Sequence, residues 1–141
     1  MIKLNFTISE FNISEQPIPE DIADKILKYH ILPMQDVRNE FGRALIVSDK
    51  SGYRPVWWEK ARDRSGNSQH CFHGKGAVDW TCRDFKKYKN KLLDLIIKHT
   101  GYTRIAVYGT FIHCDYKATD GKRYIFSSTK RSKWTLKETI E

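Results

Sequence analysis

The amino-acid sequence predicts a single α+β domain with N-terminal helices, one long central helix and a small antiparallel sheet. Apolar residues at helical spacing fill the first third of the chain and residues 83–99, whereas short strand-like runs separated by turns follow residue 100. Helices followed by runs of strands are typical of α+β folds. The chain has 141 residues, 40% of them hydrophobic, which is enough for a buried core, and we expect residues 1–141 to form one domain.

The N-terminal part of the chain is expected to be mainly helical. Pro17 and Pro19, followed by acidic residues, favour a helix start, because proline and negative charge both suit the first turn. Gly42 is a natural end for a later helix, since glycine readily adopts the left-handed conformation found after helices. The expected elements are a short strand within residues 1–16, a helix from Pro17 to about Tyr29, a helix over 34–41 and a buried strand over 44–47.

The second half of the chain is expected to hold the long helix and most of the sheet. Residues 54–69 are polar and predict a loop. Residues 83–99 place apolar side chains on one face and lysines on the other, which is the pattern of an amphipathic helix, and Gly101 ends it. Strands are expected over residues 77–81, 104–108, 110–116 and 123–127, and the tail from Lys130 is expected to add a last strand on which Trp134 packs.

The formal net charge of +8 does not choose among several kinds of partner. A basic surface suits nucleic acid, an anionic membrane or a polyanionic cell wall, and equally a solvated face that only aids solubility. We expect no nucleic-acid partner, because the sequence holds no recognition-helix or RNA-binding signature. A basic nucleic-acid-binding domain without metal is the more distant alternative. We expect the chain to act as a monomer.

The sequence contains no recognisable membrane or export segment. Its longest apolar run, around residues 92–97, is far shorter than a bilayer requires, so we expect no membrane span. The N-terminus lacks the basic start, apolar stretch and cleavage site of a signal peptide. We therefore expect synthesis in the cytoplasm, and exit by another route if the protein acts outside the cell.

The chain has three cysteines, an odd number that does not make a disulfide framework. Cys71 and Cys114 each adjoin a candidate metal ligand, but the Cys-x-x-Cys spacing of structural zinc sites is absent. A residue next to a ligand on a strand points to the opposite face of the sheet. We therefore expect both cysteines to be small buried hydrophobes.

Two histidines and one aspartate in separate segments, His70, Asp79 and His113, are the candidate metal ligands. Three protein ligands plus water are the arrangement of a hydrolytic zinc site, whereas structural zinc is usually closed by four cysteine-rich ligands. Strand periodicity places His113 and Asp115 on the same face, and Asp79 can reach the same ion from a neighbouring strand.

Several short motifs, in this order, resemble those of the M15 family of zinc peptidases, which includes D-Ala-D-Ala carboxypeptidases and related phage lysins. They are a helical lead-in over residues 17–48, then Ser51–Arg54, Ser68–His70 with Gly76–Asp79, and His113–Asp115. The resemblance spans roughly residues 17–117. It implies the small sheet-and-helices fold that this family shares with the hedgehog signalling domain.

The resemblance also implies that His70, Asp79 and His113 bind Zn²⁺. Family members usually place six residues between the first histidine and the aspartate, whereas eight separate His70 from Asp79 here. Either this loop holds a two-residue insertion or His73 replaces His70 as the ligand. We favour His70 because it follows Ser68 and Gln69 as in the family motif. His73 is then a neighbour of the ligands, a substrate contact or simply exposed.

Further roles follow from the same resemblance. Many relatives carry a general base two or three residues before the last ligand, where this chain has Phe111 and Thr110, which cannot take a proton. Asp115 is expected either to be the base or to orient His113 by accepting its other ring N–H. Arg54 is expected to bind substrate and to polarise the scissile carbonyl. The resemblance adds Ser68, Tyr53 and Trp80 as residues that contact substrate or shape the pocket.

These observations together predict a zinc-dependent metallopeptidase, a hydrolase that cuts peptide bonds in the stem peptides of cell-wall peptidoglycan. It would act as a D-Ala-D-Ala carboxypeptidase or as an endolysin-type endopeptidase. By analogy with phage lysins, such a chain is expected to be phage-encoded and released to the cell wall at lysis. The alternative is a non-catalytic zinc-binding interaction module of the same fold, because metal ligands alone do not establish hydrolysis.

Overall fold

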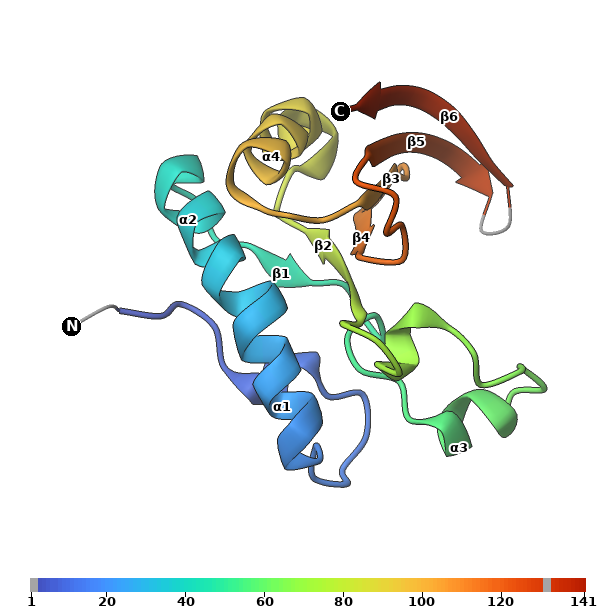
Figure 1. Cartoon of the computed structure of the whole chain (residues 1–141). Coiled ribbons are helices and arrows are strands. Elements are labelled where there is room, and N and C mark those ends of the chain that lie inside the picture. The colour runs from blue at the N-terminus through green and yellow to red at the C-terminus, as the bar shows by residue number, and fades with distance from the viewer. Residues whose placement is uncertain (1–2, 131–132) are drawn as a thin grey trace.

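The chain folds as an α+β structure in which helices pack against a six-stranded mixed sheet (Figure 1). The computed structural model describes residues 3–130 and 133–141. The strands lie in the order β1-β2-β4-β3-β5-β6. Their bounds are β1 Ile46–Val47, β2 Ala77–Thr81, β3 Arg104–Val107, β4 Ile112–Asp115, β5 Arg123–Lys130 and β6 Lys133–Ile140.

One strand pair corrects the expectation of an antiparallel sheet, because β3 and β5 run parallel. The cause is the position of β4 between β2 and β3, which leaves the far edge of β3 as the place for the next strand. Asp115 ends β4 opposite Arg104, and Tyr124 at the start of β5 also pairs with Arg104. The short connection therefore stays at one end of the sheet, and β5 begins where β3 begins.

The two predicted N-terminal helices form one continuous helix (Figure 1), made of α1 (Glu20–Ile26), a π-helical turn η2 (Leu27–Ile31) and α2 (Leu32–Phe41). Pro33 suggests a break, because proline removes a backbone donor and its ring clashes with the preceding turn of an α-helix. Here the wider π-helical turn directly precedes it and the chain continues as a helix. Gly42 ends α2 in the left-handed conformation, as expected.

One further helix lies where the sequence predicts it, and two other segments differ from the prediction. The helix expected over residues 83–99 is present as α4 (Phe85–His99). The strand expected near the N-terminus is absent from residues 3–16; Thr7 and Glu10 instead cap a short 3-10 helix, η1 (Ile8–Phe11). The expected loop over 54–69 holds a short helix, α3 (Val56–Lys60), which follows Pro55 and ends within two turns.

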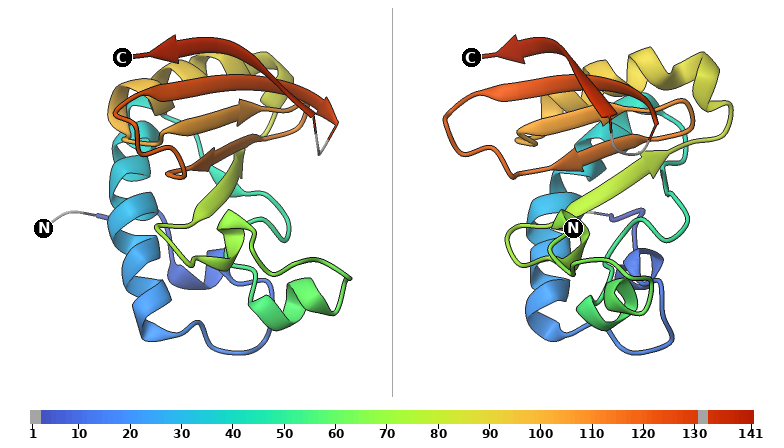
Figure 2. Two further views of the ribbon diagram at one scale, coloured as in Figure 1. Left: turned by 45° about the vertical axis from the view of Figure 1, so that its right-hand side comes forward. Right: turned by 90° about the vertical axis from the view of Figure 1, so that its right-hand side faces the viewer.

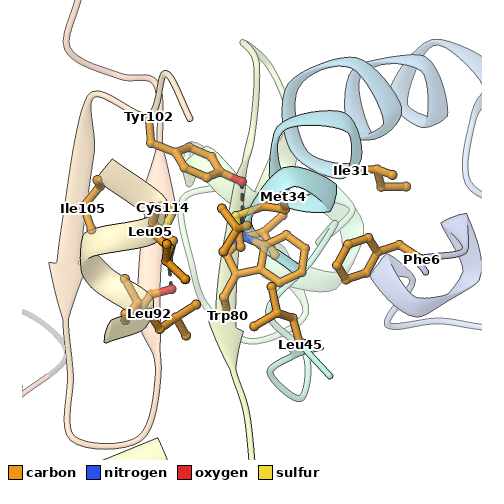
Figure 3. Packing of buried hydrophobic residues seen from close by; sticks show 14 of the residues in the cluster. Phe6, Ile31, Met34, Leu45, Trp80, Leu92, Leu95, Tyr102, Ile105 and Cys114 are labelled. Atoms are coloured by element: carbon orange, nitrogen blue, oxygen red, sulfur yellow. Dashed lines mark hydrogen bonds between the residues drawn. The ribbon is translucent and has the colours of Figure 1, made fainter. Parts of the chain in front are cut away.

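The core lies between the sheet and helices α2 and α4, and Trp80 occupies its centre (Figures 2 and 3). Phe6 and Phe11 meet the Trp80 ring edge-on, and its indole N–H donates a hydrogen bond to Tyr102 Oη at 3.2 Å. Strand alternation then directs Asp79, the preceding residue, to the opposite face of the sheet. Cys71 and Cys114 are free and buried, as expected, and Cys82 is free and buried as well.

No helix within the described residues combines the length and the apolar character that crossing a membrane requires.

Candidate metal centre

The sheet and one loop bring His70, Asp79 and His113 together on the face opposite the core. Asp79 on β2 and His113 on β4 are direct partners in the antiparallel register. His70 enters from the 3-10 turn η3 (Gln69–Cys71), and its ring lies 5.2 Å from the His113 ring. All three side chains are buried, and one ligand atom from each lies within 4.8 Å of the others. The three residues are therefore close enough to bind one metal ion.

Backbone contacts fix the orientation of His70. The Ser68 hydroxyl accepts a hydrogen bond from the His70 amide at 3.1 Å and caps η3. The Nδ1 of His70 lies 3.0 Å from the carbonyl oxygen of Gly52, to which it donates. This bond leaves the Nε2 lone pair directed toward Asp79, whose Oδ1 lies 3.4 Å away. His70 is thus held in the tautomer that can bind a metal through Nε2.

His113 lies between two carboxylates. Its Nδ1 is 2.8 Å from Asp79 Oδ1, and its Nε2 is 2.7 Å from Asp115 Oδ2. Burial alone would lower the pKa of His113, but the hydrogen bonds to Asp115 and Asp79 raise it to about 9. Burial would likewise raise the pKa of Asp79, but the adjacent histidines hold it well below its ordinary value. Without a metal, the extra proton on His113 supplies the positive charge that faces the two carboxylates.

Asp115 is fully buried and its oxygens are already occupied. Arg104, its direct partner on β3, donates from Nε at 2.9 Å and from Nη2 at 2.5 Å, and the backbone amide of Lys117 donates at 2.9 Å. These bonds and the one from His113 outweigh burial and lower the pKa of Asp115. This geometry suits the role in which Asp115 orients His113. It does not suit the role of general base, because both carboxylate oxygens already accept hydrogen bonds from the protein.

The loop between His70 and Asp79 keeps His73 away from the cluster. Phe72 adopts a left-handed conformation and packs under Gly76, where a Cβ atom would lie 2.1 Å from the Phe72 ring. The residues between them are pushed to the surface, so His73 is exposed and its Nε2 bonds to the carbonyl oxygen of Gly66 at 2.8 Å. The long spacing therefore forms a surface turn, and His70 rather than His73 joins Asp79 and His113.

A pocket of about 480 Å³ opens above the three candidate ligands. One wall is aromatic: Tyr108 and Phe111 stack with ring centres 4.4 Å apart, and the Trp134 indole donates to Tyr108 Oη at 2.6 Å. Trp134 also lies 5.3 Å from the His113 ring and so covers one side of the cluster. The polar residues that line the rest of the pocket are Ser48, Asp49, Ser51, Arg54, Glu59, Arg64 and Thr110.

The residues expected to contact substrate divide into two groups. Arg54 lines the pocket, and its Nε donates to the carbonyl oxygen of Lys50 at 2.6 Å. Ser68 instead caps η3, and Tyr53 packs edge-on against Phe72. Trp80 is completely buried in the core, so the expectation that it shapes the pocket is not met. Its position next to Asp79 on a strand explains this, because neighbouring strand residues face opposite sides.

Sequence reasoning missed several residues of the pocket. Glu59 and Arg64 lie in a segment that was expected to be a loop, and nothing in their spacing connects them with the ligands. Tyr108 and Phe111 flank a turn, where aromatic residues gave no separate signal. Trp134 was expected to pack on the last strand, and it does so beside His113 and Phe126.

Comparisons of the chain with protein-family models, with curated protein sequences and with solved structures found no match.

Proposed function

We propose that this protein is a zinc-dependent peptidase of the M15 type that hydrolyses peptide bonds in peptidoglycan stem peptides. The observation that carries the proposal is the buried set of His70, Asp79 and His113 at the base of a pocket large enough for a short peptide. Two imidazoles and one carboxylate form a typical ligand set for catalytic zinc, and three ligands leave a coordination position open. The sequence motifs around these residues point to the same family.

The roles of the protein's own residues follow from their positions. His70 and His113 would each offer one ring nitrogen, with the other nitrogen held by Gly52 and by Asp115 respectively. Bound zinc would polarise the scissile carbonyl and activate a water molecule. Arg54, on the pocket wall, would hold a substrate carboxylate or stabilise the charge that develops on the carbonyl oxygen.

A second candidate function is a non-catalytic zinc-binding module. It is favoured by one specific observation: Thr110 and Phe111, which lie at the positions where relatives place a general base, line the pocket but cannot transfer a proton. Asp115 is engaged with Arg104 and His113. In this alternative the ligands and the pocket serve recognition alone.

The two functions are separated by an assay of the zinc-loaded protein on purified peptidoglycan fragments, both linear pentapeptides and cross-linked dimers. A peptidase releases free D-alanine or a new amino terminus, and the release stops with a chelator and with His113→Ala. The matched control is His99→Ala, because His99 is a histidine paired with Glu40 on the surface. If the zinc-loaded protein binds the fragments but cleaves none of them, the module is the correct function.

A further inference from the structure

Glu59 is a buried carboxylate that is not one of the candidate metal ligands. Its side chain is only 2% exposed, yet it lines the same pocket as His70, Asp79 and His113. Burial of a carboxylate is costly unless the charge is paired. Arg64 supplies the pairing, with Nη1 2.8 Å from Glu59 Oε2. Glu59 is therefore a buried carboxylate, paired with Arg64, in the wall of the pocket.

The second oxygen of Glu59 is available to the pocket. Among residues 3–130 and 133–141, none donates a hydrogen bond to Oε1, and this oxygen is not one of the sealed polar atoms that lack a partner. An accessible carboxylate oxygen without a protein donor can accept a hydrogen bond from water or ligand. Glu59 thus offers one oxygen fixed by Arg64 and one oxygen open to the site.

The backbone ties Glu59 to the segment that carries the first candidate ligand. The amide of Arg54 donates to the carbonyl oxygen of His70 at 2.8 Å, and α3 begins just after it. The Cys71 thiol, next to His70, has a raised pKa through burial and then through the charge of Glu59. The Glu59 carboxylate and the His70 loop are therefore electrostatic neighbours.

The other carboxylates of the site are less suited to proton transfer. Asp79 is a candidate ligand, and Asp115 is saturated with hydrogen bonds and does not line the pocket. Asp49 lines the pocket but is exposed to solvent at its rim. Only Glu59 combines enclosure with an available oxygen among the described residues.

We propose that Glu59 is the general base of this site, a role that rests on the peptide hydrolysis proposed above. Its carboxylate takes one proton from the attacking water while the water oxygen bonds to the carbonyl carbon. The carbon–nitrogen bond of the peptide then breaks, and Glu59 passes the proton to the departing amine nitrogen. The products are one carboxylic acid and one amine, which become a carboxylate and an ammonium ion when the acid gives its proton to the amine, and Glu59 is a free carboxylate again.

The test compares zinc-loaded Glu59→Gln with the native protein in three measurements: zinc content, binding of a linear stem pentapeptide by calorimetry, and turnover. Zinc and peptide binding should stay within about threefold of native, whereas kcat should fall by at least about 100-fold, the usual effect of losing a general base. Glu40→Gln is the matched control, because Glu40 is an exposed, ion-paired glutamate, and it should leave all three measurements unchanged.

Arg64→Gln distinguishes proton transfer from a structural role of the ion pair, since it breaks the same pair and keeps the carboxylate. We expect it to retain clearly more turnover than Glu59→Gln, with thermal melts showing whether each variant folds. An active native protein with an equally active Glu59→Gln would overturn the base role alone. Loss of zinc in Glu59→Gln would also overturn it, in favour of a structural pair. A native protein that cleaves no fragment would overturn the proposed function and this role together.

Discussion

At the residue scale, the central feature is a histidine whose two ring nitrogens both face carboxylates. Asp79 and Asp115 bond to opposite sides of His113 and raise its pKa to about 9, so the ring is a cation in the metal-free protein at neutral pH. A metal would replace the proton on Nδ1 of His113. The proton on Nε2 would stay on the ring and keep its hydrogen bond to Asp115.

This arrangement predicts that zinc binding expels a proton. At pH 7 we expect about one proton released per zinc bound, because the ligand must lose its proton before it can coordinate. The release should decline as the pH rises through 9, where His113 is already neutral in the free protein. Calorimetry in buffers of different ionisation enthalpy measures the number directly. Zinc binding without proton release at pH 7 would contradict this arrangement of His113.

The contacts of Asp115 lead to a second expectation. Asp115→Asn should weaken zinc binding by about 10- to 100-fold, the usual effect of removing the carboxylate that orients a metal-bound histidine. Asp49→Asn, which changes an exposed carboxylate at the pocket rim, should leave the affinity unchanged. Competition with a chromogenic chelator gives both constants. Unchanged zinc affinity together with abolished turnover would instead assign the base role to Asp115.

At this scale, the sequence allowed the candidate ligands to be predicted but not their surroundings. His70, Asp79 and His113 stand in recognisable motifs, and the period of two along a strand placed Asp115 beside His113. Glu59 could not be found in this way. Its place in the pocket depends on a five-residue helix that neither composition nor periodicity indicates.

At the scale of elements, the continuous N-terminal helix carries a buried histidine at its π-helical turn. His30 lies on η2, with Nδ1 2.7 Å from Tyr102 Oη and Nε2 2.9 Å from the carbonyl oxygen of Lys75. Burial is the main cause that lowers its pKa to about 4. The ring therefore stays neutral and joins the helix to Tyr102, in the segment between α4 and β3, and to Lys75, in the loop before β2.

His30 makes stability depend on pH in a defined window. The unfolded chain binds a proton at His30 near pH 6.5 and the folded chain only near pH 4, so the free energy of unfolding falls as the pH drops between these values. The free energy of unfolding lost across this whole pH range is on the order of 3 kcal/mol. Denaturant unfolding of the native protein should give a lower free energy of unfolding at pH 5 than at pH 7. This decrease should be smaller in His30→Gln and the same as native in His73→Gln. A native protein equally stable at both pH values would contradict this.

Prediction of the elements failed where tertiary contacts decide the local structure. Strands β2 to β5 and helix α4 follow from periodicity and turn residues, and they lie where expected. The two helices expected over residues 17–29 and 34–41 are one continuous helix through a π-helical turn, and the parallel pairing of β5 depends on which sheet edge is already occupied. Neither fact is local to the segments concerned.

At the scale of the whole molecule, the candidate ligands come from three segments that meet only in the folded chain. A metal that binds them stabilises the folded state and not the unfolded one. With free zinc about 1,000-fold above its dissociation constant, the gain is about 4 kcal/mol. We therefore expect zinc to raise the melting temperature by roughly 8 °C or more. Differential scanning calorimetry with and without zinc measures this rise in the native protein and in Asp79→Asn. An equal rise in melting temperature in both proteins would contradict the prediction.

The net charge of +8 also belongs to the whole molecule. It favours approach to any polyanion, including the cell wall, through long-range attraction that salt weakens. Charge of this kind affects the rate of encounter more than the specificity for a substrate. For the proposed peptidase, we expect the choice of substrate to depend on the pocket, which is lined by aromatic side chains and by Arg54.

The metal centre is tested by the zinc content of the purified native protein, measured beside His70→Ala and His73→Ala. We expect one zinc per chain in the native protein and in His73→Ala, and none in His70→Ala, because His70 alone of the two histidines lies with Asp79 and His113. Zinc retained by His70→Ala but lost by His73→Ala would show that the loop binds metal in a different arrangement. No zinc in any of the three proteins, even after zinc is offered, would contradict the metal centre itself.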